Sequence, residues 1–419
     1  MKKVAFYTLG CKVNQYETDA MKEMFGKAGY EIVDFNDCAD IYVINTCTVT
    51  AQSDKKSRQI INRARRNNIN SKIIVTGCMA EETKQQNNII KDVDYILGNE
   101  ERKNIVNILE KDEVEEFKNI AECKEFWETG EVLSQERTRA YIKIEDGCNN
   151  FCTYCIIPYV RGRVRSRNID NILEEVKRVL AEGVCEIVLI GIHLGSYGKD
   201  LNGITLVDVI EKINAVEGDF RIRLGSLEPG FITEENVERL KKCQKLCSHF
   251  HLALQSGMDD TLKRMNRKYT TGEYREKVEL LRANFEDVAI TTDVIVGFPG
   301  ETDEEFDITY KFLQEINLSK LHVFPYSKRS GTIAEKMDGQ VAEEIKNMRA
   351  AKLIKLSEIQ EEEFKHKFVG KNMRVILERR EKDGYRLGYN DQYVSVLISG
   401  KEPGDVVEAV GTKENLGIY

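Results

Sequence analysis

The chain has 419 residues, of which 41% are hydrophobic and 32% charged, with 11 cysteines and a formal net charge of −8. This length predicts two or three domains, and the hydrophobic content excludes a disordered chain. We find no apolar run that suits a signal peptide or a membrane span, so we expect a cytoplasmic protein. Because the cytosol keeps thiols reduced, the cysteines are expected to serve metal binding or catalysis rather than disulfides.

The first part of the chain alternates strand-like and helical patterns. The runs KVAFYT, IYVINT and KIIVTG are strand-like, and amphipathic or basic helical stretches follow them, the first from Asn14 to Ala28. This βα alternation predicts a parallel sheet covered by helices. Cys11, Cys47 and Cys78 each follow one of these strands. Parallel strands bring their carboxyl ends to one edge of the sheet, so three cysteines that are distant in sequence are expected to converge there.

A heavily charged stretch from Ile105 to Glu136 is expected to be a linker. Six strand-like runs follow, RAYIKIE, CEIVLIG, RIRLG, HFHLAL, VAITTDVIVG and KLHVFPYS, separated by helical runs. Six βα units predict a partial barrel rather than the full eight. A helix over residues 342–368 then leads to four short alternating runs, MRVILER, YRLGY, YVSVLI and VVEAV, which predict a small all-β module.

Cys148, Cys152 and Cys155 lie in one tight loop directly after the first barrel strand. Three thiolates can hold three irons of a cubane cluster and leave the fourth iron open, which is the site at which S-adenosylmethionine (SAM) is chelated and reductively cleaved. The alternatives are a structural zinc site or scattered core cysteines. Zinc sites of that type use four ligands, and no histidine falls within this loop.

Cys11, Cys47 and Cys78 have similar flanks, TLGCKVN, NTCTV and TGCMA, each with a strand, then Gly or Thr, then Cys. A buried cysteine is often an ordinary small hydrophobe. The repeated placement of a soft ligand at strand ends instead favours a second three-cysteine cluster. The remaining cysteines lack such flanks and are interpreted as core or surface thiols: Cys38, Cys123, Cys185, Cys243 and Cys247.

The runs TLGCKVNQYET, NTCTV, TGCMAE and DGCNNFCTYCIIPYVRGRVRSR resemble those of the methylthiotransferases, and most closely the branch that acts on threonylcarbamoyladenosine in tRNA. The resemblance covers essentially the whole chain. It implies an α/β protein with a cluster-binding domain at residues 1–112, a linker at 113–134, a radical SAM core with a partial (β/α)6 barrel at 135–366, and a TRAM-like RNA-binding β module at 367–419. Lys12-Val13-Asn14 and Asp146-Gly147 favour the threonylcarbamoyl branch.

The resemblance also implies the reaction and its cofactors. A methylthio group replaces the hydrogen at C2 of N6-threonylcarbamoyladenosine at tRNA position 37, with two 4Fe-4S clusters and with SAM as both methyl donor and radical source. An electron donor such as flavodoxin or ferredoxin is implied as well. The expected SAM contacts are Tyr154, Gly191, His193, Ser226, Gln255, Asp293 and Gly297. Tyr154 can instead shield the cluster, and His193 can be an ordinary polar residue at a strand end.

Arg161, Arg163, Arg165 and Arg167 recur at every second residue, so in an extended chain all four would project to one side beside the radical loop. We expect them to bind RNA phosphates, although a solvated charge run is the simpler interpretation. A second basic segment follows Cys47 and contains Lys55, Lys56, Arg58, Arg63, Arg65 and Arg66.

Three alternatives in function stay open. Sister families modify isopentenyladenosine in tRNA or an aspartate of a ribosomal protein, with the same clusters and a different substrate. An iron–sulfur protein that only binds tRNA or senses redox state would not cleave SAM.

Overall fold

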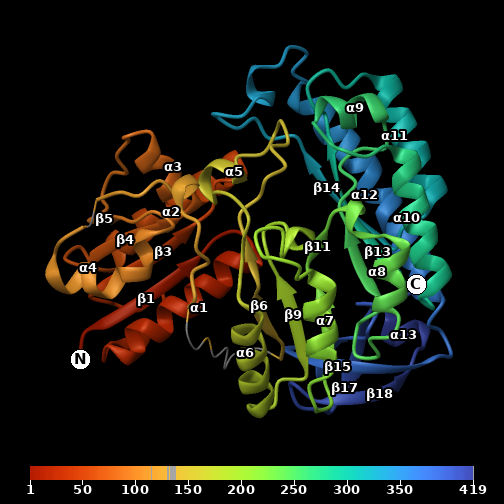
Figure 1. The fold of residues 1–419 in the computed structure, drawn as a ribbon, viewed down its shortest axis with the longest axis horizontal. Helices are drawn as coiled ribbons and strands as arrows, with labels where there is room; N and C mark the ends of the chain where they lie inside the picture. The colour runs from red at the N-terminus through yellow and green to blue at the C-terminus, as the bar shows by residue number, and fades with distance from the viewer. Residues whose placement is uncertain (115, 130–131, 133–137, 419) are drawn as a thin grey trace. The chain divides into compact units, whose positions relative to one another are not determined.

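The computed structural model describes residues 1–114, 116–129, 132 and 138–418, which form two compact units (Figure 1). Unit 1 comprises Met1–Ser134, Lys143–Asn168 and Ser327–Glu335, and unit 2 comprises Gln135–Ile142, Ile169–Tyr326 and Lys336–Tyr419. Both sets of cysteines singled out above fall in unit 1. The cysteine loop after the first barrel strand therefore groups with the N-terminal domain rather than with the barrel strands of unit 2.

Unit 1 is built around a five-stranded parallel sheet in the order β2-β1-β3-β4-β5. The strands are β1 (Lys3–Thr8), β2 (Glu31–Val33), β3 (Ile41–Thr46), β4 (Lys72–Gly77) and β5 (Tyr95–Ile96). The three strands predicted from the sequence are confirmed as β1, β3 and β4. The central strand β3 is buried along its whole length, as expected for a parallel strand covered on both faces.

Helices cover both faces of this sheet. They are α1 (Lys12–Lys27), α2 (Ala51–Asn67), α3 (Cys78–Gln85), the 3-10 turn η1 (Glu101–Asn104) and α4 (Ile105–Lys111). Phe25 of α1 and Ile108 of α4 pack with Val43 on one face, and Ile61 of α2 packs with Tyr42 on the other. The expectation of a linker from Ile105 is thus wrong for its first residues, because the apolar face of α4 belongs to the core.

The remaining part of unit 1 surrounds the cysteine loop at residues 148–155. Strands β7 (Glu145–Asp146) and β8 (Arg165–Ser166) pair antiparallel on either side of that loop in sequence. Helix α5 (Ile157–Val160) follows the last cysteine directly, and the short turn η2 (Ile120–Glu122) comes from the segment before the loop.

Unit 2 contains the six strands expected for the barrel, divided between two sheets of order β10-β9-β6 and β11-β12-β13-β14. They are β6 (Ala140–Lys143, the last residue of which groups with unit 1), β9 (Glu186–Ile190), β10 (Arg221–Leu224), β12 (His249–Leu252), β13 (Ala289–Val296) and β14 (Lys320–Pro325). The short strand β11 (Ser226–Leu227) was not expected. The pairings of β9 with β10 and of β11 through β14 are parallel.

The helices that follow the strands of these two sheets are α6 (Ile169–Ala181), α7 (Leu206–Asn214), α8 (Glu234–Leu240), α9 (Asp259–Arg264), α10 (Thr271–Asn284), α11 (Asp303–Ile316) and α12 (Glu343–His366), with 3-10 turns η3 (Leu194–Ser196), η4 (Pro229–Phe231) and η5 (Ala334–Lys336). Four of these helices begin at a threonine cap, namely α7, α8, α10 and α11. Thr205 and Thr270 form capping boxes at α7 and α10. Thr302 accepts a hydrogen bond from the Glu305 amide and so caps the start of α11.

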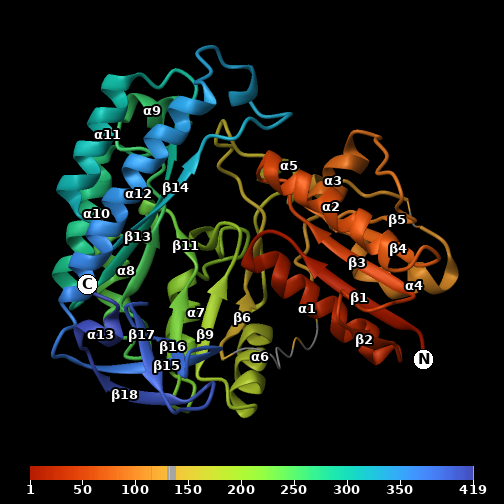
Figure 2. The same ribbon diagram turned by 180° about the vertical axis from the view of Figure 1, so that it is seen from behind.

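The C-terminal residues form an antiparallel sheet in the order β17-β16-β15-β18 (Figure 2), as the four short runs predicted. Its elements are β15 (Asn372–Lys382), β16 (Tyr385–Tyr389), β17 (Ser395–Ser399), β18 (Val406–Val410) and the terminal helix α13 (Lys413–Leu416). Arg221, at the start of β10, forms an ion pair of 2.9 Å with Asp391 of this module. The module therefore lies beside the amino end of β10.

Across the part of the chain that the structure describes, no helix combines the length and the apolar character needed to cross a membrane.

Candidate functional site

The N-terminal cysteines, defined here as Cys11, Cys47 and Cys78, follow three neighbouring strands of the unit 1 sheet. Cys11 precedes α1 in the loop after β1, Cys47 comes directly after β3, and Cys78 is the first residue of α3 after β4. Because β1, β3 and β4 are adjacent and parallel, their carboxyl ends meet at one edge of the sheet. Cys47 and Cys78 are buried and Cys11 is exposed.

Two close approaches hold these loops together. The Asn14 amide nitrogen donates to the Leu9 carbonyl at 2.7 Å and to the Thr46 carbonyl at 3.0 Å, which ties the Cys11 loop to the end of β3. Gly10 has φ +104°, and a Cβ at that position would lie 3.1 Å from the Cys47 sulfur. Only glycine fits there, so the chain passes directly over Cys47.

The electrostatics of the buried thiols indicate what these residues need in order to bind metal. Burial raises the pKa of the Cys47 thiol and raises the pKa of Cys78 to about 12, although the neighbouring Arg161 guanidinium opposes the second shift. Thiolates are the metal-binding form of cysteine. A buried thiol of this kind ionises only beside a strong positive charge, and the iron of a cluster supplies such a charge. The placement of the N-terminal cysteines at one edge of the sheet, and not their pKa values, is what fits a cluster.

Among the residues that the structure describes, no three His, Cys, Asp or Glu side chains already stand in a geometry for one metal ion. A single ion gathers several ligands closely around itself. A cubane is held by one cysteine on each of several irons, so its sulfur ligands stand farther apart than those of one zinc.

The radical-loop cysteines, defined as Cys148, Cys152 and Cys155, lie in the loop between β7 and α5 and are partly exposed. The Cys148 amide donates to the Gly162 carbonyl at 3.1 Å, and the Cys155 amide donates to the Cys152 carbonyl at 3.0 Å, so both ends of the loop are fixed by backbone hydrogen bonds.

Backbone strain and close packing mark this loop. Phe151 adopts φ +49°, a conformation that is rare for a bulky residue and that often occurs at functional sites. Gly147 has φ +85°, and a Cβ there would lie 2.0 Å from the Arg163 carbonyl oxygen, so this position requires glycine. Tyr154, the expected adenine contact, is partly exposed between two cysteines.

The bridging segment, Ser327–Glu335, was not recognised from the sequence. Arg329 is 7% exposed and pairs with Glu82 of α3 at 2.6 Å and with Asp54 of α2. It also donates to the hydroxyl of Thr48, the residue after Cys47. Farther along the segment, the Ala334 amide donates to the Thr153 carbonyl inside the radical loop at 2.8 Å. The segment thus connects the surroundings of both cysteine sets, and the only sequence signal was an arginine beside a Gly-Thr turn after the sixth barrel strand.

The expectation that four arginines form a phosphate-binding row is wrong in its geometry. Arg161, Arg165 and Arg167 are buried, and only Arg163 is exposed. Arg161 caps α5 rather than lying in an extended strand. Acidic partners from distant segments pair with the buried arginines, for example Glu128, which accepts from Arg167 at 2.7 Å. Alternation along the sequence did not reveal these acids.

Arg163 alone keeps the expected exposure, and its guanidinium lies 4.4 Å from the centre of the Phe151 ring, over the radical loop. The basic helix α2 is similarly divided. Arg65 pairs with Asp94 at 2.8 Å, and Arg63 donates to Asn36, so neither is a simple phosphate ligand. The exposed cations of this helix are Lys55, Lys56, Arg58 and Arg66.

A buried charge network in unit 1 joins helix α1 to the segments around the radical loop. It comprises two carboxylates, Glu17 and Asp146, and four cations: Arg102, Lys143, Arg161 and Arg165. Burial alone would raise the pKa of Glu17, but Arg102, Arg161 and Lys143 more than offset it and hold that pKa at about 2. Glu17 was missed in the sequence because its partners are far away in the chain.

The residues expected to contact SAM from the barrel lie in unit 2, at or near the carboxyl ends of its strands. Gly191 and His193 follow β9, Ser226 begins β11, Gln255 comes shortly after β12, Asp293 is in β13, and Gly297 follows β13. Gln255 has φ +74° and bridges to Val294 in parallel fashion. Gly297 has φ +69°, and its amide donates to Glu301 at 2.8 Å.

His193 is 8% exposed, and its Nδ1 lies 2.5 Å from the Ser196 hydroxyl. Burial lowers its pKa, which favours the neutral ring at pH 7. Asp293 lies 3.3 Å from the Nε2 of His251 on the neighbouring strand, and the ring of His251 lies 5.5 Å from that of His322. The two histidines were not singled out from the sequence, although HFHLAL places His251 opposite the apolar face of its strand.

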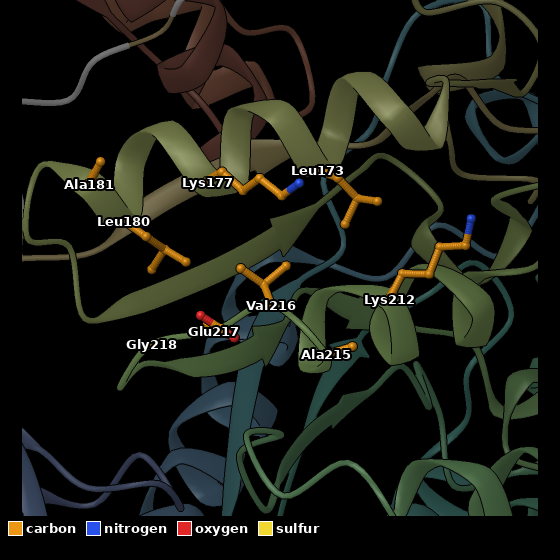
Figure 3. A pocket seen from close by; sticks show the side chains of 9 residues that line it. All are labelled: Leu173, Lys177, Leu180, Ala181, Lys212, Ala215, Val216, Glu217 and Gly218. Carbon is orange, nitrogen blue, oxygen red and sulfur yellow. The ribbon is translucent and has the colours of Figure 1, made fainter.

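A pocket in unit 2 lies apart from these residues (Figure 3). Leu173, Lys177 and Leu180 of α6 face Lys212 of α7 and Val216 across it. None of the residues expected to contact SAM or RNA lines this pocket. The other cysteines are divided as expected between core and surface: Cys243 and Cys247 are buried, Cys123 and Cys185 are partly buried, and Cys38 is exposed.

Two family models match the chain. Residues 142–313 match the Radical SAM superfamily, and residues 3–98 match an uncharacterized protein family, UPF0004. Among solved structures, the radical S-adenosylmethionine methyltransferase TsrM from Kitasatospora setae is similar to 77% of this chain and 73% of its own, with a TM-score of 0.56 and 13% identity. That likeness concerns the fold alone.

Curated relatives match over almost their whole length. The threonylcarbamoyladenosine tRNA methylthiotransferase MtaB of Bacillus subtilis (strain 168) is 42% identical, covering 96% of this chain and 91% of the relative. MtaB of Aquifex aeolicus (strain VF5) is 39% identical, covering 97% and 100%. The tRNA-2-methylthio-N(6)-dimethylallyladenosine synthase of Clostridium botulinum (strain Loch Maree / Type A3) is 35% identical, covering 98% and 91%. The chain therefore belongs to the methylthiotransferase family of radical SAM enzymes.

Proposed function

We propose that this chain transfers a methylthio group to C2 of N6-threonylcarbamoyladenosine at position 37 of tRNA. The observation that carries the proposal is that both sets of three cysteines fold into one compact unit, joined by the bridging segment. The names of the relatives at 42% and 39% identity support the same substrate.

Membership in the radical SAM superfamily implies SAM and one 4Fe-4S cluster. The radical-loop cysteines would hold this cluster. A cluster bound there would chelate SAM and pass on the electron, received from a reductant, that cleaves SAM to a 5′-deoxyadenosyl radical. The backbone hydrogen bonds at Cys148 and Cys155 fix the loop in position for this ligand.

SAM itself would be bound by residues from the loop and from the barrel strands. Tyr154 would contact the adenine, and the strand-end residues would supply the other contacts: Gly191, His193, Ser226, Gln255, Asp293 and Gly297. The low pKa of buried His193 suits a neutral hydrogen-bonding partner rather than a cation beside the SAM sulfonium.

The N-terminal cysteines would hold a second 4Fe-4S cluster, which would present the sulfur that is transferred. Their placement at three adjacent strand ends and the burial of Cys47 and Cys78 support this role. The two clusters would serve one reaction that uses two SAM molecules, one as methyl donor and one as radical source. Reductive cleavage requires an electron donor, for which flavodoxin or ferredoxin is proposed.

The four-part organisation is proposed with the boundaries expected from the sequence: 1–112, 113–134, 135–366 and 367–419. The six parallel strands would form a partial (β/α)6 barrel, and the C-terminal antiparallel sheet would be a TRAM-like RNA-binding module. Of the expected arginine row, Arg163 is retained as a phosphate contact because it is exposed. The exposed cations of α2 are a second candidate contact with the anticodon arm.

Nucleoside analysis of tRNA tests the proposal. The gene is expressed in a host whose own threonylcarbamoyladenosine methylthiotransferase has been deleted, beside a matched variant with alanine at Cys152. We expect the 2-methylthio derivative of threonylcarbamoyladenosine to appear only with the natural chain. A methylthio product on isopentenyladenosine, or on a ribosomal protein aspartate, would contradict the proposed substrate and favour the corresponding sister activity.

A further inference from the structure

Arg161 was expected to face RNA, and its burial beside the N-terminal cysteines suggests a different role. We infer that Arg161 is a positioning residue for these cysteines, and that it supplies the buried positive charge which balances an anionic cluster bound by them. The inference rests on the proposed second cluster. It assigns to this arginine the control of the reduction potential and retention of that cluster.

The contacts of Arg161 place it among all three cysteine loops. Its Nη2 donates to the side-chain oxygen of Asn14, the residue whose amide ties the Cys11 loop to the end of β3. Cys78 packs in one buried cluster with Val160, the residue before Arg161. Arg161 and its neighbour Val160 thus contact the segments that carry the N-terminal cysteines.

Arg161 is held in this position by the charge network. Its side chain is 0% exposed, with Nη1 at 2.5 Å from Glu17 Oε1 and Nη2 at 2.9 Å from Glu17 Oε2. This two-pronged pairing fixes the plane of the guanidinium. Arg161 also follows Cys155 by six residues (161 − 155). The same short segment therefore carries the last radical-loop cysteine and the cation that lies beside the N-terminal cysteines.

The charges in this network do not balance. Its ion pairs join four cations to two carboxylates, so within this set positive charges outnumber negative ones by two (4 − 2). Buried charge is costly unless it is compensated. A cubane held by three thiolates is an anion in both of its common oxidation states and gains a further negative charge on reduction. A cluster beside Arg161 would supply the compensation.

This arrangement has a measurable consequence. A fixed cation close to a cluster stabilises the reduced form more than the oxidised form, because the reduced form carries more negative charge. Removing the cation should therefore shift the midpoint potential to a more negative value. It should also weaken retention of the cluster, since changes to residues that support metal ligands typically reduce affinity by about 10- to 100-fold.

The experiment uses the full chain with alanine at Cys148, Cys152 and Cys155, so that only the N-terminal cysteines can hold a cluster. After reconstitution with iron and sulfide, iron content, the EPR spectrum of the reduced protein and the midpoint potential are measured with arginine or methionine at position 161. We expect Arg161→Met to lower the midpoint potential and to accelerate loss of iron to a chelator. Arg102→Met is the matched control, because Arg102 is equally buried and also pairs with Glu17.

The outcomes separate the inference from the proposal on which it rests. Equal shifts for Arg161→Met and Arg102→Met, or no shift in either, would overturn the role of Arg161 and leave the second cluster intact. If the protein with alanine at Cys148, Cys152 and Cys155 bound no iron while Arg161 was present, the second cluster would be overturned as well. Should circular dichroism show that Arg161→Met does not fold, Arg161→Gln and Arg102→Gln decide, because glutamine also removes the charge. Arg161→Gln should lower the midpoint potential and Arg102→Gln should not, and an unchanged Arg161→Gln protein would refute the inference.

Discussion

Replacing Arg329 by alanine should destabilise unit 1 strongly for a single substitution outside its apolar core. The side chain is 7% exposed, and its partners Glu82 and Asp54 are 13% and 24% exposed. Removing one member of a fully buried ion pair costs about 3–5 kcal/mol, whereas exposed pairs contribute about 0–1 kcal/mol. Because both acids keep some contact with solvent, we expect a loss of about 2–3 kcal/mol in the free energy of unfolding, between these two limits.

Trp127, the single tryptophan of the chain, lies in unit 1 and reports its unfolding by fluorescence during urea denaturation. Lys22→Ala is the control, since Lys22 and Asp19 form a single partly exposed pair three residues apart on one helix, which should contribute under about 0.5 kcal/mol. Hydrogen exchange of the Ala334 amide, which donates to Thr153, should accelerate in Arg329→Ala and stay unchanged in the control. If the two variants unfolded at the same urea concentration, the bridging segment would not be held by this arginine.

Four further predictions concern the clusters, the RNA and the charge network. Alanine at any radical-loop cysteine should abolish 5′-deoxyadenosine formation, measured by chromatography, and normal formation would refute the assignment. Alanine at any N-terminal cysteine should preserve SAM cleavage while the methylthio nucleoside disappears, so a triple variant with full iron content and product would contradict a second cluster. Arg163→Ala should weaken tRNA binding and reduce its salt dependence, which binding measurements across a salt series would show. Arg165→Ala should chiefly lower the stability of the protein, which thermal melts would show. The pKa of Glu17 is lowered from 4.5 to about 2 in the folded state. Its ion pairs therefore stabilise the protein fully above pH 4.5, and this contribution is lost as the pH falls from 4.5 to about 2. Glu17→Gln should flatten the acid unfolding curve recorded from Trp127 fluorescence, and an unchanged curve would argue against the network.

Short-range patterns in the sequence were sufficient for most of the elements. The strands β1, β3 and β4 were predicted because parallel buried strands are nearly continuous apolar runs. The same patterns placed Cys11, Cys47 and Cys78 at strand ends, and the rule that parallel strands share an edge predicted that they converge. The tight loop of Cys148, Cys152 and Cys155 was likewise evident, because its spacing is local.

The role of the arginines could not be predicted in this way. Alternation of Arg161 and Arg165 along the chain indicated a shared exposed face, but an ion pair depends on residues that are distant in sequence. Glu17 lies 144 positions from Arg161, and no local pattern indicates that α1 brings it there. The same limit applies to Arg329, whose partner Asp54 is 275 positions away.

The sequence by itself therefore determined the order of elements, the two sets of cysteines and the family, because these depend on hydrophobic periodicity and on short motifs. Only the tertiary structure decided that Lys143–Asn168 and Ser327–Glu335 fold with the N-terminal sheet, and that three of four arginines are structural. The physical reason is that burying a charge requires a partner of opposite sign, and the chain supplies those partners from segments that meet only after folding.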